Sequence, residues 1–211
     1  MVALGASGCG KSTLLNLLAG LDAPSSGSVT VHGRNGLMFQ ESALFPWLTV
    51  QRNVELALRL RGVGRAERRH RVAELLDLVH LGDFADRRPH ELSGGMRQRV
   101  ALARALAQDA DVLLMDEPFG ALDAMTRDLL HDELERIWLH TGATIVFVTH
   151  NVREAARLGD QVVLLSSRPG RVAATFPVEM ERPRRIEDVG VGTLATEVTQ
   201  RLRQEVARHA R

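Results

Sequence analysis

Apolar runs alternate with amphipathic stretches along most of this chain. Four runs without alternation, at residues 1–4, 112–115, 144–149 and 162–166, are typical of strands that are buried on both faces of a sheet. Helical spacing occurs at 11–19, near 124–140 and in a short stretch before the last run. This order predicts an α/β fold with a parallel sheet covered by helices on both faces. Residues 29–33 and 36–40 predict two further short strands.

Residues 41–109 have helical spacing throughout. Thr49 is placed to cap a helix over "TVQRNVELALRL", and Gly62 and Gly64 separate this helix from the next one. The apolar residues of that next helix share one face: Val72, Leu75, Leu76 and Val79. Arginines at 59, 61, 65, 68, 69 and 71 would fit a nucleic-acid surface, but interleaved acidic residues favour a solvated helix face. A basic "RPRR" at 182–185 precedes a last helix with apolar positions 194, 198, 202 and 206.

The charge balance and the cysteine content exclude some kinds of function and structure. The 211 residues include 27 Lys and Arg against 26 Asp and Glu, so no global field attracts nucleic acid or acidic partners. A single cysteine excludes an internal disulfide framework and suits a reducing cytoplasm. No apolar run reaches the length of a membrane span, and no signal peptide opens the chain. We therefore expect a protein that reaches a membrane only through a partner.

A glycine-rich loop joins the first predicted strand to the first predicted helix. "GASGCGKST" has the spacing of a phosphate-binding loop, in which glycines let backbone N–H groups wrap the phosphates. Lys11 supplies a positive charge and Ser12 a hard oxygen ligand for Mg²⁺. Cys9 is best explained as a small side chain at a permissive position, with a reactive thiol as the alternative. We expect ATP and Mg²⁺ to be bound by these residues: Gly5, Ala6, Ser7, Gly8, Cys9, Gly10, Lys11, Ser12 and Thr13.

Two acids and a histidine follow predicted strands. Asp116 and Glu117 come after the 112–115 run, and His150 follows the 144–149 run. Ligands of doubly wound sheets lie at the carboxyl ends of the strands. We predict that Asp116 holds Mg²⁺, directly or through water, and that Glu117 orients and deprotonates the attacking water. His150 is predicted to contact the γ-phosphate. The alternative for the two acids, a solvated turn after a strand, is less favoured because a phosphate loop lies upstream. For His150 the alternative is a structural or solvated histidine, less favoured because of its position beside the other strand ends.

A second loop of the same kind lies in the middle of the chain. In "LSGGMRQRVALARAL", residues 92–106, a Ser-Gly-Gly tip opens directly onto a helical pattern. Exposed N–H groups at the positive end of a helix form an anion-binding site. A chain with one nucleotide site therefore has two loops suited to phosphate.

These motifs, in this order, identify a resemblance. The chain resembles the ATP-binding subunit of ABC transporters over nearly its whole length, through the phosphate loop, Gln40 after "MF", "LSGGMRQ" (92–98), "LLMDEP" (113–118), "GALD" (120–123) and "VTH" (148–150). The resemblance implies a P-loop NTPase (RecA-like) core with an inserted α-helical subdomain. Residues 1–40 and 110–180 would form the nucleotide-binding core, 41–109 the helical subdomain with the signature motif, and 181–211 a C-terminal tail.

The resemblance also implies a role for the second loop. In this family two ATPase subunits pair head to tail, and each ATP lies between the phosphate loop of one and the signature loop of the other. Ser93, Gly94 and Gly95 would then bind the ATP held by the opposite copy, and Asp123 would cross the interface. Gln40 would take part in catalysis and in Mg²⁺ binding. ATP would favour the dimer because it fills the interface.

Finer details resemble importers for nitrate, sulfonates, taurine or bicarbonate, among them "FQESALFPWLTVQRNV" and "FGALDAMTR". In such systems the segment after Gln40 receives a coupling helix of the membrane permease. Phe45, Pro46 and Trp47 would contact that helix, or alternatively form ordinary subdomain core. The expected location is the cytoplasmic face of the inner membrane, bound through the permease. An external solute-binding protein would be an indirect partner, and nucleic acid none.

Two features depart from the family pattern. Relatives have further N-terminal strands and an aromatic residue that stacks on adenine, so we expect an incomplete N-terminal β-region. Relatives also have several more residues between "VTVHGR" and "NGLMFQ", which affects the placement of Gln40. Two alternatives to an importer subunit are a soluble ABC-type ATPase not linked to transport and a truncated nucleotide-binding module with little turnover.

Overall fold

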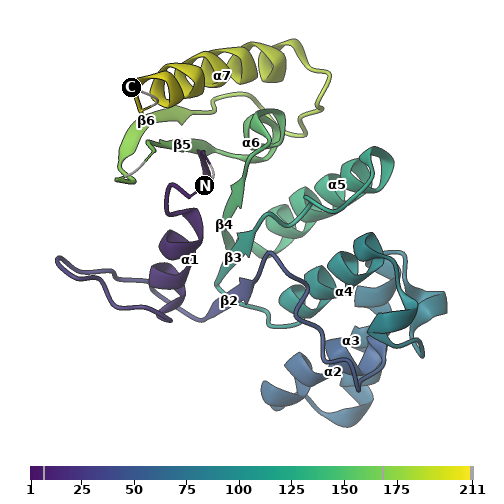
Figure 1. The fold of residues 1–211 in the computed structure, drawn as a ribbon. Coiled ribbons are helices and arrows are strands. Elements are labelled where there is room, and N and C mark those ends of the chain that lie inside the picture. The colour runs from purple at the N-terminus through teal and green to yellow at the C-terminus, as the bar shows by residue number, and fades with distance from the viewer. Residues whose placement is uncertain (7, 168, 210–211) are drawn as a thin grey trace. The chain divides into compact units, whose positions relative to one another are not determined.

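The computed structural model describes residues 1–6, 8–167 and 169–209 (Figure 1). The chain divides into two compact units. The first comprises Met1–Val31, Leu114–Glu117 and Thr144–Arg211, and the second His32–Leu113 and Pro118–Ala143. No helix among the described residues has both the length and the apolar content to cross a membrane. The predicted boundaries of the helical subdomain and the tail stay a prediction.

Six strands are hydrogen-bonded in the order β2-β3-β4-β1-β5-β6. Their bounds are β1 Val2–Gly5, β2 Asn35–Met38, β3 Val112–Asp116, β4 Thr144–Thr149, β5 Gln161–Leu165 and β6 Val172–Pro177. The four buried runs predicted from the sequence are all strands. The strand predicted at 29–33 is wrong, because those residues are mostly exposed and no covered face sustains their alternation. β6 was missed because its half-exposed residues form no apolar run.

The ladders of the first unit fix where its strands end. β1 pairs in parallel with β4, with Leu4 opposite Thr149, and in parallel with β5, with Gly5 opposite Leu165. The first three residues of β1 are fully buried, as the apolar run predicts. β6, by contrast, runs antiparallel to β5. Because parallel strands end at one edge, the residues after Leu4 and Thr149 lie at the same edge of the sheet.

The described residues of the first unit form three helices: α1 Lys11–Ala19, α6 Val152–Leu158 and α7 Val189–His209. α1 has the predicted bounds and buries Leu15. α6 packs on α7 through a cluster of small residues, Ala156, Val191 and Ala195, which let the two helices approach closely. The predicted apolar face of the last helix is only partly covered, because Val198 is buried and Val206 is exposed.

The second unit contains four α-helices among its described residues: α2 Val50–Leu60, α3 Arg65–Leu78, α4 Gly94–Leu106 and α5 Ala124–Thr141. Two short 3₁₀ turns, Gly82–Phe84 and Pro89–Glu91, lie between α3 and α4. Thr49 caps α2 as predicted, since its side chain accepts from Arg52 N. The apolar face predicted for α3 is buried. Some of the arginines form structural contacts: Arg61 donates to Ala107 O at 3.2 Å, and Arg68 pairs with Glu55 at 3.1 Å.

The basic stretch at 182–185 includes a buried charge. Arg184 is 3% exposed, and its guanidinium donates to the carbonyl oxygens of Met180 at 2.8 Å and Gly159 at 2.6 Å. Longer bonds reach Val178 O and Arg157 O. A buried guanidinium stabilises the folded protein only while its hydrogen-bond acceptors are in place. Arg184 therefore ties the segment after β6 to the end of α6.

Arg184→Ala is expected to lower the free energy of unfolding by about 3 kcal/mol, because the buried carbonyl groups lose their donor. Thermal and urea unfolding followed by circular dichroism measure this loss. Arg185→Ala is the matched control, since Arg185 is exposed and its removal should change stability by less than about 0.5 kcal/mol. Equal effects of the two substitutions would contradict the structural role of Arg184.

Candidate functional site

The loop between β1 and α1 is shaped by two glycines. Gly10 has φ 99°, a left-handed conformation that L side chains rarely adopt, and it begins α1 without a side-chain cap. A Cβ on Gly5 would lie 2.5 Å from Cys9 Sγ. Cys9 is itself buried, which favours the small-side-chain explanation over a reactive thiol. Ser7, predicted to bind phosphate, lies outside the described residues.

Lys11 folds back over this loop. Its Nζ donates to Gly5 O at 3.0 Å and to Ala6 O at 3.1 Å. The first turn of α1 contains no acidic residue, and its N–H groups have no side-chain acceptor at the cap. An ammonium group and the positive end of a helix therefore face the same loop, an arrangement suited to phosphate.

Ser12 meets Asp116 although 104 residues separate them in the sequence. Ser12 Oγ donates to Asp116 Oδ2 at 2.6 Å, and Asp116, the last residue of β3, is 9% exposed. These are two hard oxygen donors, the ligand type of Mg²⁺. Among the described residues, no three His, Cys, Asp or Glu side chains gather into a metal site. The donor set therefore fits Mg²⁺ that also uses phosphate oxygens of a nucleotide, and does not fit a metal held by protein alone.

Glu117 and His150 form a second pair in the first unit. His150 Nδ1 lies 3.2 Å from Glu117 Oε2. The backbone of Glu117 is left-handed, with φ 46°, and its N–H donates to Val148 O at 2.9 Å. Strained backbone of this kind persists only where its surroundings hold it, and it is concentrated at functional sites. The hydrogen bond to β4 thus directs the Glu117 side chain toward the end of the neighbouring strand.

The residue after His150 was missed by the sequence analysis. Asn151 caps α6, because its Oδ1 accepts from Arg153 N at 3.1 Å and Glu154 N at 3.3 Å. Its own N–H donates to Thr149 Oγ1 at 3.0 Å. His150 is therefore held between the end of β4 and a capped helix. An Asn directly before a helical stretch was the signal that could have revealed this cap.

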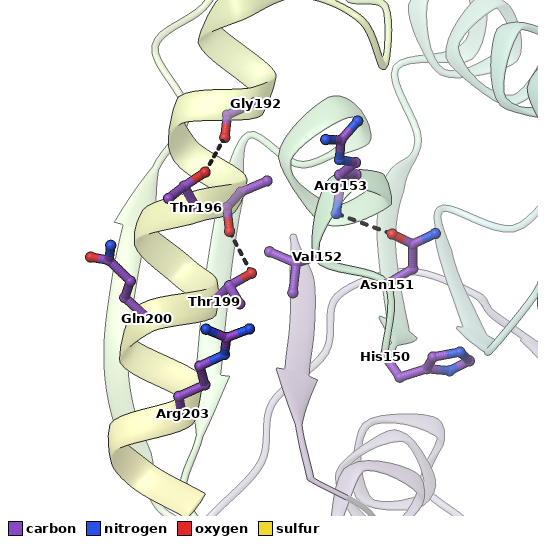
Figure 2. Close-up of a pocket in the computed structure, with 10 residues that line it drawn as sticks. His150, Asn151, Val152, Arg153, Gly192, Thr196, Thr199, Gln200 and Arg203 are labelled. Atoms are coloured by element: carbon purple, nitrogen blue, oxygen red, sulfur yellow. Dashed lines mark hydrogen bonds between the residues drawn. The ribbon is translucent and has the colours of Figure 1, made fainter.

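A groove of about 480 Å³ lies beside these residues, between α6 and α7 (Figure 2). Its wall on α7 includes two threonines, Thr196 and Thr199, whose hydroxyls donate to Gly192 O and Ala195 O of their own helix. His150 reaches one side of the groove, whereas no described residue of the phosphate loop lines it. The groove is therefore separate from the described residues of the phosphate loop.

The second unit contains the other predicted site residues. Ser93 caps α4, because its Oγ accepts from Met96 N at 3.2 Å, and Gly94 and Gly95 form the first turn. A Cβ on Gly95 would lie 3.4 Å from Ala121 O, so the "GALD" segment packs beside the signature loop. Two loops predicted to face a second ATP are thus neighbours within this unit.

Asp123 and Gln40 have contrasting surroundings in the same unit. Asp123 caps α5, and the hydrogen bond from Thr126 N, at 3.0 Å, lowers the pKa of its carboxyl group. The carboxylate is therefore charged at neutral pH. Gln40 is exposed two residues after β2 ends at Met38, not at the end of the strand as predicted. Within the described part of the chain its side chain makes no hydrogen bond.

Comparison with known proteins decides the family. Residues 1–120 match the family described as ABC transporter. The chain belongs to the ABC transporter family. It is 52% identical over 190 residues to the taurine import ATP-binding protein TauB of Rhizobium johnstonii, an alignment that covers 86% of this chain and 72% of that protein. The ABC transporter ATP-binding protein MJ0412 of Methanocaldococcus jannaschii, described as uncharacterized, is 46% identical over 87% of this chain and 72% of its own length.

Solved structures agree with this assignment. A dimeric structure of the ATP-binding cassette MJ0796, in a post-hydrolysis state bound to ADP and Pi, superposes with a TM-score of 0.78. It is 34% identical, and the superposition covers 85% of each chain. The predicted P-loop NTPase fold is therefore confirmed, with a mostly parallel sheet. As a member of this family, the chain is an ATPase coupled to transport.

The left-handed backbone of Glu117 generates a stability prediction. Glu117→Asn is expected to raise the free energy of unfolding by about 1 kcal/mol, because Asn tolerates this conformation better than Glu. Glu117→Gln is the control, since it removes the same charge without relieving the backbone. Thermal unfolding of the two variants measures the difference. An equal gain for Gln would show that charge, and not backbone conformation, is responsible.

Proposed function

We propose that this chain is the ATP-hydrolysing, energy-coupling subunit of an importer for a small anion, with sulfonates such as taurine favoured over nitrate or bicarbonate. The observation that supports hydrolysis most strongly is the pair of contacts at the strand ends of the first unit, Ser12–Asp116 and Glu117–His150. The names of several relatives, taurine import ATP-binding proteins, support the solute class. A nucleotide-binding module without turnover would have no need for the second pair.

ATP would bind where Lys11 now donates to its own loop. Phosphate oxygens would replace Gly5 O and Ala6 O as acceptors, and the first-turn N–H groups of α1 would complete the cradle. Ser12 and Asp116 would hold Mg²⁺, which neutralises charge on the phosphates when it is bound. Their present hydrogen bond keeps the two oxygens close together before the nucleotide arrives.

Glu117 would act as the general base for the attacking water. His150 Nδ1 lies 3.2 Å from Glu117 Oε2, so a protonated imidazole would pair with the carboxylate and occupy the base before nucleotide binds. The His150 side chain is largely exposed and free to turn toward a γ-phosphate. Such a turn would release the carboxylate for water, and ATP binding would thereby activate its own hydrolysis.

The second phosphate-shaped loop would serve the nucleotide of a second copy of this chain. Ser93 caps α4 through its oxygen lone pair, which leaves its hydroxyl proton available for a phosphate. Packing within the chain does not require glycine at Gly94 or Gly95. A Cβ added to either residue would meet no atom closer than 3.4 Å. A ligand that approaches their backbone closely explains both glycines. Asp123, kept charged by its capping bond, would lie in the same interface.

The segment after Gln40 would contact the membrane permease. Trp47 is 68% exposed, and its ring lies 5.5 Å from that of Phe45. This exposure favours a docking surface over the alternative of subdomain core. A groove of about 350 Å³ along α2 is lined by Leu48, Arg52 and Leu56, among others. The chain would thus lie at the cytoplasmic face of the inner membrane, and an external solute-binding protein would be an indirect partner.

Glu117→Gln is expected to form a stable dimer when ATP and Mg²⁺ are added, because slow hydrolysis keeps nucleotide in the interface. Light scattering after size-exclusion chromatography measures the mass with and without nucleotide. ATPase activity of this variant should fall at least about a hundredfold. A variant that stays monomeric and binds no ATP would contradict the proposal.

Gly94→Ala, placed in the Glu117→Gln background, is expected to abolish ATP-dependent dimerisation without harming the fold. Thermal stability should stay unchanged or rise by up to about 1 kcal/mol, because Ala favours the helix. Gly192→Ala is the matched control, because its Cβ would meet nothing within 4 Å and that of Gly94 nothing closer than Arg97 Nη2 at 4.0 Å, whereas Gly192 lies in α7. Dimerisation of Gly94→Ala with wild-type ATP dependence would remove the signature loop from the proposed interface.

A further inference from the structure

The exposed Trp47 lies at the tip of a turn that is itself part of no strand or helix. Leu48 N donates to Phe45 O at 3.1 Å, so residues 45–48 form a β-turn with Pro46 and Trp47 at its centre. Proline at the second position fixes the backbone for this turn. The remaining backbone groups of the segment need partners elsewhere, because buried polar groups are costly when unpaired.

Asn53 supplies those partners from the first turn of α2. Its side chain is 0% exposed, and its Oδ1 accepts from Phe45 N at 2.8 Å. Its Nδ2 lies 3.2 Å from Phe45 O, 3.3 Å from Leu48 O and 3.0 Å from Thr49 O. One buried amide therefore closes both ends of the turn that presents Trp47.

Arg104 holds the other half of the segment. Its two terminal nitrogens donate to Ser42 O and Ala43 O, each at 2.8 Å. Ala43 has φ 43°, a left-handed conformation that needs such support. Arg104 lies in the last turn of α4, and Ser93 of the signature loop is the N-cap of the same helix. A helix of 13 residues thus connects the signature loop to residues 42 and 43.

We propose that Asn53 and Arg104 are positioning residues that hold residues 42–48 as a preformed docking turn and make its position follow α4. A preformed turn binds more tightly because no ordering cost remains at the moment of binding. A helix is stiff along its axis, so a shift at Ser93 on nucleotide capture would be passed through Arg104 to the turn. This inference rests on the proposed function, since it assumes that the signature loop takes up ATP and that the turn meets the permease.

The test uses Trp47 as its own reporter. The sequence contains two tryptophans, so Trp138→Phe leaves Trp47 alone, and Glu117→Gln is added to retain ATP. In this reference protein, iodide quenching of Trp47 is measured with and without ATP and Mg²⁺, and amide hydrogen exchange is measured over residues 42–49. Asn53→Ala and Arg104→Lys are then compared with the reference. Arg69→Ala, an exposed arginine of α3, is the control.

Both variants are expected to speed exchange in this segment by about tenfold, since each removes a hydrogen bond that protects it. They should also lose the ATP-dependent change in Trp47 quenching, while ATP-dependent dimerisation is retained. Arg104→Lys keeps the charge and concerns a half-buried residue, so it decides the question if Asn53→Ala does not fold.

Unchanged exchange and quenching in the variants would overturn the inference. The inference would also be overturned if Trp47 quenching in the reference protein did not change with ATP although the dimer formed. If the reference protein does not dimerise, the proposed function is contradicted instead. Hydrogen exchange at residues 42–49 then tests on its own whether Asn53 and Arg104 hold the turn.

Discussion

β1 is paired in parallel with β4 on one side and with β5 on the other, and these two ladders determine where each strand stops. Leu4 stands opposite Thr149, so the phosphate loop and His150 leave the sheet at the same edge. Glu117 is fixed to that edge by the bond from its N–H to Val148 O. The positions of the phosphate loop, Glu117 and His150 therefore depend on backbone pairing in which their side chains take no part.

Two non-glycine residues with left-handed backbone, Glu117 and Ala43, lie in segments for which we propose a function, and each is held by a hydrogen bond to another element. Glu117 is held by β4, and Ala43 by the guanidinium of Arg104. In both cases the strained backbone sets the direction of the adjacent side chain or segment, which would otherwise have no fixed orientation. The cost of the strain is offset by hydrogen bonds from elements that are themselves well packed, which is why both positions can persist.

The glycines divide into two kinds. Gly5 and Gly10 are required by the chain itself, one by the approach of Cys9 and the other by a positive φ. Gly94 and Gly95 meet no obstacle in the chain, so their small size has to be explained by something that approaches from outside. This contrast supports the proposal that the second loop completes the site of another molecule, whereas the first loop shapes its own site.

The sequence by itself determined the strand–helix alternation, the phosphate loop, the capped α2 and the family, because each depends on local spacing or on a contiguous motif. It did not predict β6 or the absence of a strand at 29–33, since a half-exposed strand and an exposed alternating stretch look alike without knowledge of what covers them. Only the tertiary structure joined Ser12 to Asp116 across 104 residues and buried Arg184 within an apparently basic tail. The roles of Asn53 and Arg104 also came from the tertiary structure alone, because an amide or a guanidinium reveals its function only through the carbonyl groups that the fold brings to it.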